Sequence, residues 1–303
     1  MIKGITVSKR MMQLRHFLLV SVVAAGVSSH LLAASSADQL ARAASLYNST
    51  DYHGALNALV PMQSRTAAAN LLIGKSYYML GDFKKATDAF HQAASMDPGN
   101  SEYHHWLGRA YGRRAESGNP LTAPGHASKA RQNFEKAVQL DPKNSEALND
   151  LFDYYLQAPG FLGGGLDKAQ ALLPKIKAID SAEFSFAQAQ IAEKRKEFTT
   201  AEQQLRRAVE LAPRQVGRVL DLAKFLLRQG RVPEGDALMS HAAKIAPNDP
   251  KVLFEQASVY VQSKRNLGEA RKLLKAYMQA PLTPDMPSRA DAQKLLKQAE
   301  GGD

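Results

Sequence analysis

A glycine-rich stretch at residues 159–165 is the first segment of the sequence whose residue types suggest chemistry. Glycines that lead into a helix N-terminus can present free backbone N–H groups to an anion. A phosphate-binding loop also needs a Lys-Ser or Lys-Thr pair after the glycines and a strand before them, and neither is found here. Asp167 is expected to cap the following helix, and its carboxylate would repel an anion. We therefore interpret the stretch as a structural turn, with an anion site as the alternative.

The adjacent His104 and His105, followed by Trp106, are the next candidates for chemistry, as metal ligands. Neighbouring side chains on a helix point about 100° apart, which is a poor arrangement for binding one ion. No His-x-x-x-His or His-Glu pair supports them, and His126 is equally isolated. We predict no metal site and no cofactor, and we interpret His105 as groove lining and Trp106 as packing.

Catalytic motifs are also missing from the sequence. It contains no cysteine, which excludes disulfides, thiolate zinc sites and cysteine nucleophiles. Serine, histidine and acidic residues are present, but no G-x-S-x-G motif occurs and no pair of acids stands out from solvated helix faces. We predict that the protein is not an enzyme and has no catalytic residues. A site assembled only by folding would not be visible at this level.

Residues 1–34 have the order of a secretory signal, namely basic residues, an apolar run and then small residues. The apolar run from Phe17 to Val27 has 11 residues, whereas a membrane-spanning helix needs roughly 20. We expect cleavage near Ala33 to Ser36 and export, with the periplasm as the preferred location. Secretion and an uncleaved N-terminal anchor are the alternatives, and no stable membrane span is expected after signal removal.

The net charge of the whole chain is +10. Without the four basic residues of the signal segment, 35 basic residues face 29 acidic ones, a balance of +6. This positive charge weakly favours anionic partners and is uninformative about the fold. Export argues against nucleic acid as the natural ligand.

From about residue 37 the sequence repeats a helix–turn–helix pattern. The clearest copy, from Ala67 to Pro98, has an apolar stripe at helical spacing, a break at Gly81-Asp82, a second stripe and a closing proline. The prolines of two later copies, Pro213 and Pro247, stand 34 residues apart. In four copies a small residue precedes the closing proline by 12 positions. Such a regular period predicts a stack of similar units.

This combination of a 34-residue helical period, small residues, aromatic residues and closing prolines resembles the tetratricopeptide repeat family, here an exported bacterial member. The resemblance covers about residues 37–280 and implies an all-α fold, a right-handed α-α superhelical solenoid. We count about seven helical hairpins, beginning near residues 37, 67, 101, 145, 182, 216 and 250. A polar amphipathic helix at 288–299 is expected to cap the last hairpin. Residues 35–303 are thus predicted to form a single solenoid domain.

The small residues of the repeat have a packing reason. Gly74, Gly108, Ala86 and Ala130 are expected where two helices cross closely, because a larger side chain would hold the helices apart. One unit cannot bury its apolar faces alone, so stacking of neighbouring units is obligatory.

Two insertions, at about residues 112–126 and 157–167, interrupt the period. Each replaces the short turn between the two helices of a repeat. In a solenoid such insertions tend to gather on one edge. Tetratricopeptide-like proteins of bacterial envelopes resemble this chain in carrying a glycine-rich insert between repeat helices, and the resemblance does not reveal its use.

The resemblance implies which residues face a partner, since the first helix of each tetratricopeptide unit lines the concave face. Carried over by position, the groove candidates are Lys75, Tyr78, His105, Arg109, Arg113, Asn149, Asp153, Phe186, Gln190, Lys224, Arg228 and Phe254. A groove that mixes aromatic, arginine and amide groups suits a peptide or a helix of another protein. For each residue a solvated helix face is the alternative.

We predict a periplasmic or envelope-facing adaptor that holds a segment of a partner protein in this groove without covalent chemistry. One alternative is binding of an anionic glycan or cell-wall polymer, suggested by the positive charge and the basic group around Arg109. Another is a subunit of a secretion, pilus or polysaccharide-export assembly. Tetratricopeptide repeats serve many processes, so the fold does not choose among these functions.

Overall fold

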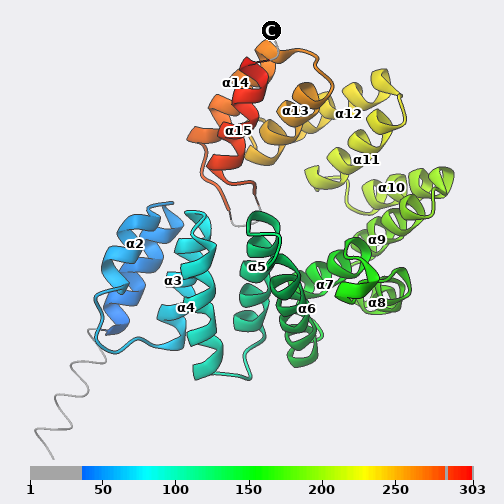
Figure 1. Cartoon of the computed structure of the whole chain (residues 1–303). Coiled ribbons are helices and arrows are strands. Elements are labelled where there is room, and N and C mark those ends of the chain that lie inside the picture. The colour runs from blue at the N-terminus through cyan, green and yellow to red at the C-terminus, as the bar shows by residue number, and fades with distance from the viewer. Residues whose placement is uncertain (1–35, 284–285, 302–303) are drawn as a thin grey trace, which may run out of the picture. The chain divides into compact units, whose positions relative to one another are not determined.

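The computed structural model describes residues 36–283 and 286–301, and the chain divides after Arg65 into two compact units. The predicted signal segment, residues 1–34, lies outside the described residues. Within them every regular element is a helix, and no strand is present (Figure 1). This confirms the predicted all-α fold.

The first unit contains one helical hairpin in its described part. Residues 36–48 form a helix that is followed by α2 (Tyr52–Leu59). Asp51 caps α2, since its carboxylate accepts a hydrogen bond of 2.8 Å from the backbone N–H of Gly54. The rings of Tyr47 and Tyr52 lie 5.3 Å apart between centroids and connect the two helices. This hairpin corresponds to the first of the predicted repeats.

The second unit contains six helical hairpins and a terminal helix in its described residues (Figure 1). The first helices of the hairpins are α3 (Ala67–Met79), α5 (Ser101–Ser117), α7 (Ser145–Gln157), α9 (Ser181–Lys194), α11 (Val216–Arg228) and α13 (Pro250–Gln262). The second helices are α4 (Phe83–Met96), α6 (Ala123–Leu140), α8 (Leu166–Ile179), α10 (Phe198–Leu211), α12 (Val232–Ile245) and α14 (Leu267–Gln279). The terminal helix is α15 (Arg289–Glu300). These starts agree with the predicted repeat starts to within one residue.

Side-chain caps fix where most of the first helices begin. Asn100, Asn144, Asp180 and Asp249 stand directly before α5, α7, α9 and α13, and each accepts a hydrogen bond from a backbone N–H in the first turn. The register of each first helix, and therefore the direction of its groove-facing side chains, is set locally by these residues.

Small residues allow the two helices of a hairpin to approach closely. A Cβ placed on Gly74 would lie 2.4 Å from a ring carbon of Phe90, and one on Gly108 would lie 2.7 Å from ring carbons of Phe134. Both rings are buried, so they have no room to move away. The predicted packing role of these glycines is confirmed.

The terminal helix α15 covers the apolar face of the last hairpin. Ala292 and Leu296 are buried against Leu274 and Tyr277 of α14, while the outward positions of α15 are polar and exposed. Ser288 begins the helix with a capping box. The predicted capping helix is thus present, shifted by one residue.

The insertion at 112–126 is largely helical, in contrast to the expectation that it simply replaces the turn. It lengthens α5 to 17 residues and α6 to 18, whereas α3, α4 and α9 have 13 or 14. Residues 113–117 continue α5 because Arg113 and Glu116 form an i,i+3 ion pair of 3.0 Å and proline comes only at position 120. A short connection at 118–122 joins the two helices.

The glycine-rich insertion forms a tight turn containing a 3₁₀ segment, η1 (Gly160–Leu162). The Tyr154 hydroxyl donates a hydrogen bond of 2.9 Å to the Leu162 carbonyl, which anchors the turn to α7. A Cβ on Gly164 would lie 1.8 Å from the carbonyl oxygen of Ala158, so only glycine fits there. The N-cap of α8 is Gly165, and Asp167 lies within the first helical turn. Asp167 is therefore not the cap that was expected.

Candidate functional site: a charged pocket on the first helices

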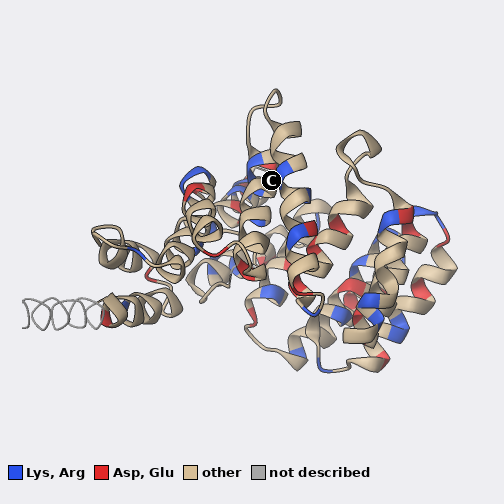
Figure 2. Cartoon of the chain, turned by 90° about the horizontal axis from the view of Figure 1, so that it is seen from below, with Lys and Arg blue, Asp and Glu red and all other residues tan. Residues whose placement is uncertain are grey.

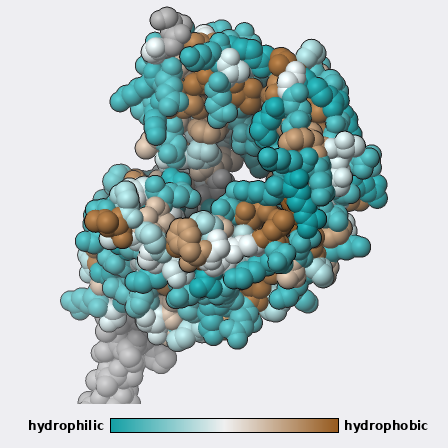
Figure 3. Space-filling model, turned by 45° about the vertical axis from the view of Figure 1, so that its right-hand side comes forward, coloured by the Kyte–Doolittle hydropathy of each residue, from teal (hydrophilic) through white to brown (hydrophobic). Residues whose placement is uncertain are grey.

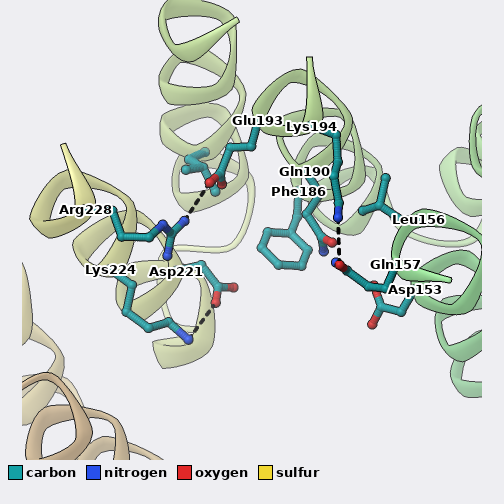
Figure 4. Close-up of a pocket in the computed structure, with 11 residues that line it drawn as sticks. Asp153, Leu156, Gln157, Phe186, Gln190, Glu193, Lys194, Asp221, Lys224 and Arg228 are labelled. Carbon is teal, nitrogen blue, oxygen red and sulfur yellow. Dashed lines mark hydrogen bonds and ion pairs between the residues drawn. The ribbon is translucent and has the colours of Figure 1, made fainter. Parts of the chain in front are cut away.

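A pocket of about 610 Å³ lies at α7, α9 and α11, the first helices of three successive hairpins (Figure 4). The side chains that line it come from all three helices and include carboxylates, amides, cations and apolar groups. They are Asp153, Leu156, Gln157, Phe186, Gln190, Glu193, Lys194, Asp221, Lys224 and Arg228, with Leu205 of α10. The structure therefore brings together five of the predicted groove residues, Asp153, Phe186, Gln190, Lys224 and Arg228.

Arg218 of α11 does not line this pocket, but it contacts Phe186 and Asp221, which do. Its guanidinium lies 4.3 Å from the centroid of the Phe186 ring, in a cation–π contact. The same group forms ion pairs with Glu183 of α9 and, at 3.3 Å, with Asp221 of its own helix. Burial raises the pKa of Glu183, and the charge of Arg218 opposes this effect. The ring of Phe186 is held in place from α11 as a result.

Ion pairs join most of the neighbouring first helices in the described part of the second unit. They are Lys75–Glu102 (2.6 Å), Arg109–Asp150 (3.7 Å), Arg218–Glu183, Arg228–Glu193 (2.7 Å) and Lys224–Glu255 (3.1 Å). These pairs connect α3 to α5, α5 to α7, α9 to α11 and α11 to α13. Lys and Arg positions lie interspersed with Asp and Glu positions over the helices (Figure 2).

The junction between α7 and α9 is different. Among the described residues no ion pair joins these two helices. Uncharged acceptors or donors take part in the polar links instead, for example in the hydrogen bond of 2.8 Å from Lys194 Nζ to Gln157 Oε1 (Figure 4). Asp153 of α7 lies at this junction and faces the pocket. The pocket thus coincides with the place where charge pairing between neighbouring first helices is interrupted.

Asp153 has an altered acidity at this position. Part of its side chain is open to the pocket, but protein atoms surround it on other sides, and the loss of bulk water raises the pKa of its carboxyl to about 7. The negative charges of Asp150 and Glu183 add to the rise, whereas a hydrogen bond from Gln190 opposes it. A nearby positive charge would stabilise the ionised form of this carboxyl group.

The predicted basic group on α3 and α5 is neutralised and packed. Arg109 lies 3.7 Å from Asp150, and its guanidinium is 4.8 Å from the Trp106 ring centroid and 5.6 Å from that of Tyr78. Lys75 pairs with Glu102 and also lies over the Trp106 ring, at 5.0 Å. We therefore assign Lys75, Tyr78 and Arg109 to an aromatic–cation cluster that joins two hairpins.

His105 is only 1% exposed and its Nε2 lies 2.8 Å from Asp150, so it is not accessible to a partner, in contrast to its interpretation as groove lining. His104 points elsewhere, with its ring nitrogens 3.1 Å from Asn133 Oδ1 and from the Pro98 carbonyl oxygen. In the described part of the chain no group of three or more His, Cys, Asp or Glu residues could hold a metal ion.

The remaining predicted residues lie outside the pocket. Arg113 pairs with Glu116 and, at 3.5 Å, with Asp291 of α15. Asn149 lines a second, smaller pocket of about 300 Å³. Phe254 packs against Tyr277, with ring centroids 5.0 Å apart, and therefore belongs to the core of the last hairpin.

Some pocket residues were missed by sequence reasoning. Asp221 stands three residues before the predicted Lys224 and seven before the predicted Arg228, so it shares their face of α11, and this spacing could have revealed it. Glu193 carries no such signal, because its partner Arg228 belongs to another hairpin.

The tetratricopeptide repeat model matches residues 67–100, which span α3 and α4. A tetratricopeptide repeat protein from Parabacteroides merdae has a similar structure, with a TM-score of 0.58, 14% identity, and coverage of 88% of this chain and 99% of that one. TTC0263, a thermophilic tetratricopeptide protein of Thermus thermophilus, has a TM-score of 0.51, 20% identity, and coverage of 63% and 99%. None of the curated proteins compared with the chain matches it.

The chain contains one segment, residues 67–100, that matches the tetratricopeptide repeat model, and its structure has the fold of these tetratricopeptide repeat proteins. This confirms the predicted solenoid of helical hairpins. The tetratricopeptide repeat generally mediates protein–protein interaction, and its scaffolds are typically non-catalytic. None of the helices in the described residues has the length and apolar character required to cross a membrane.

Proposed function

We propose that the protein is an exported adaptor of the cell envelope, most simply of the periplasm, that binds a segment of a partner protein across the first helices of its repeats. The observation that carries this proposal is the pocket of Figure 4, where three first helices contribute apolar, amide and charged side chains to one concave space. Such a mixture suits a peptide segment, since apolar groups supply contact area and polar groups fix its register.

The mixture of apolar and polar groups on the surface and in the pocket supports the same proposal. On the face seen in Figure 3, hydrophobic patches lie within a largely hydrophilic surface. Phe186 and Leu156 provide the apolar part of the pocket lining, and the surrounding carboxylates, amides and cations form a polar rim. This arrangement of an apolar centre and a polar rim is typical of protein interfaces.

Binding of an anionic glycan or cell-wall polymer is the weaker candidate. It requires cations that are free to contact an anion, but three groove cations, Lys75, Lys224 and Arg228, each have a carboxylate within 3.1 Å. A fourth, Lys194, donates a hydrogen bond to Gln157. An anionic polymer would have to compete with these carboxylates. A subunit role in a secretion, pilus or export assembly is one form of the adaptor function and differs from it only in the identity of the partner.

A photo-cross-linking amino acid at position 194 tests the proposal in the cells that produce the protein. Lys194 lies at the pocket and is exposed, so its replacement should not disturb packing. The matched control places the same amino acid at Gln203, an exposed position on α10. We expect one or two protein adducts that form from position 194 and not from position 203. Identical adducts from both positions, or polymer adducts only, would contradict the adaptor function.

Export is tested separately, by mass spectrometry of the protein recovered from cell fractions. We expect a mature N-terminus between Ala33 and Ser36 and recovery with the periplasmic fraction. An intact N-terminus in the membrane fraction would instead support an uncleaved anchor.

A further inference from the structure

We infer that the pocket at α7, α9 and α11 recognises a partner segment through an arginine or lysine side chain, whose cationic group pairs with Asp153. This inference rests on the proposed function, because it names the chemistry of the segment that the same pocket would bind.

The charges around the pocket favour a cation over an anion. On α11, Arg228 pairs with Glu193 at 2.7 Å, and Lys224 lies 3.6 Å from Asp221 and 3.1 Å from Glu255. The pocket cations of this helix are therefore already matched by carboxylates. An incoming anion would have to displace one of these carboxylates, at a cost in ion-pair energy.

Asp153, in contrast to these paired cations, is surrounded mainly by other acidic groups. The charges that act most strongly on it are the carboxylates of Asp150, Glu183 and Asp221, and its hydrogen-bonding neighbour is the neutral amide of Gln190. Asp150 itself contacts His105 at 2.8 Å and lies 3.7 Å from Arg109, so the Arg109 cation is engaged on the α5 side. Lys194 of α9 lies at the same junction, but its ammonium donates to Gln157, and among the described residues no ion pair joins a cation to Asp153. A cation brought by the ligand would supply that partner.

The space beside Asp153 fits a long basic side chain. The pocket volume of about 610 Å³ is ample for one side chain and adjacent peptide backbone. Leu156 and Phe186 line it and can pack against the methylene stem of arginine or lysine, while the charged head reaches the carboxylate. Gln157 and Gln190 offer amide groups to the backbone of an extended segment.

The same geometry predicts that binding depends on pH. A ligand cation pairs with the ionised carboxylate, and the pKa of Asp153 is raised to about 7 in the free protein. The other charged groups that line the pocket are Glu193, Lys194, Asp221, Lys224 and Arg228. Asp150 and Glu183 act on Asp153 from outside the lining, and Asp150 in turn contacts His105 and Arg109. Affinity for a basic segment should rise by about tenfold between pH 6 and pH 8, and this rise should be absent in Asp153→Asn.

The test uses the mature chain, residues 35–303, and random 12-residue peptides displayed on phage as the probe. Peptides are selected for binding at pH 8. Those that bind in the pocket are identified by their cross-linking to a photoreactive amino acid at position 194, and their affinities are measured by fluorescence anisotropy. Asp153→Asn is compared with Asp88→Asn, which removes an exposed carboxylate on α4 away from the pocket. In the peptide, citrulline replaces arginine and removes only the charge.

We expect pocket-bound peptides to share an arginine or lysine, and Asp153→Asn to weaken their binding by about tenfold or more. The citrulline peptide should bind the wild-type protein more weakly than the arginine peptide does, by a similar factor. With Asp153→Asn, the replacement of arginine by citrulline should cause little further loss of affinity, because both changes remove the same interaction. Pocket-bound peptides without a basic residue, or without dependence on Asp153, overturn this inference and leave the adaptor function standing. If no selected peptide cross-links to position 194, both are wrong.

Discussion

The Arg218 guanidinium lies 4.3 Å from the centroid of the Phe186 ring and at the same time forms ion pairs with Glu183 and Asp221. One side chain of α11 thus holds an aromatic ring and a carboxylate of α9, which belongs to the preceding hairpin. Arg218 is 13% exposed and Glu183 is 19% exposed, so this contact is largely shielded from water and salt. The geometry of the pocket wall depends on it.

Replacement of Arg218 by alanine is expected to lower the free energy of unfolding by about 2–4 kcal/mol, because Glu183 is left as a shielded carboxylate without its cation. Burial already raises the pKa of Glu183, so protonation should relieve part of the loss. The loss measured by urea unfolding should therefore be larger at pH 8 than at pH 5. Arg206→Ala, which breaks an exposed i,i+4 pair with Glu202, should cost at most about 0.5 kcal/mol. Equal losses for both variants would show that Arg218 is not a structural link.

Gly108 and Gly112 lie one turn apart on α5 and should respond oppositely to alanine. A Cβ at Gly108 would be 2.7 Å from two ring carbons of Phe134, so Gly108→Ala should destabilise the protein by about 1–3 kcal/mol. Nothing lies within 4 Å of a Cβ at Gly112, and Gly112→Ala should stabilise it by about 0.5–1 kcal/mol through helix propensity. Thermal unfolding followed by circular dichroism measures both changes. Two changes of the same sign would contradict the close helix crossing at Gly108.

The glycine-rich insert offers a second matched pair. Gly164→Ala should disrupt the turn, because the new Cβ would collide with the Ala158 carbonyl, whereas Gly160→Ala meets no atom within 4 Å and should be tolerated. Hydrogen exchange of the backbone amides of residues 158–165 reports the difference. We expect faster exchange in Gly164→Ala, with α10 and later helices unchanged. Uniform slow exchange in both variants would mean that the turn does not need this glycine.

Asp153 should make the stability of the protein depend on pH. Its pKa rises from 3.8 to about 7 on folding, so the folded protein holds this proton more tightly than the unfolded chain does. The stabilising contribution of the protonated group is complete below pH 4 and is lost as the pH rises through about 7. Asp153→Asn should therefore gain stability relative to the wild type across this range and keep a constant difference above pH 8. Asp88→Asn serves as the control. An equal pH-dependent gain in stability in Asp88→Asn would show that the titration of Asp153 is not the cause.

The sequence alone predicted the helices, their order and their starts. Capping residues such as Asn100 and Asn144, and glycines such as Gly74 and Gly108, act on the backbone within one or two turns or on the paired helix of the same hairpin. Their effects therefore repeat with the period of the sequence and can be recognised from it. The exception is the insertion at 112–126. It interrupts the 34-residue period, so it was expected to be a turn, whereas most of it continues α5 and α6.

Some of the predicted groove residues line the pocket and others do not, because a side chain that faces inward is not necessarily accessible. Phe186, Gln190 and Arg228 reach the pocket, whereas His105 is buried against Asp150 of the next hairpin. That difference depends on which side chain of α7 stands opposite α5, and the separation of 45 residues hides it from any local pattern.

Each repeat thus determined its own helices from nearby residues, since capping and helical periodicity are short-range effects. Tertiary structure decided which charges are matched and which are not, because an ion pair forms only where stacking brings side chains of two hairpins within a few ångströms. The pairing of Arg228 with Glu193 is one result of this stacking, and the acidic surroundings of Asp153 are another.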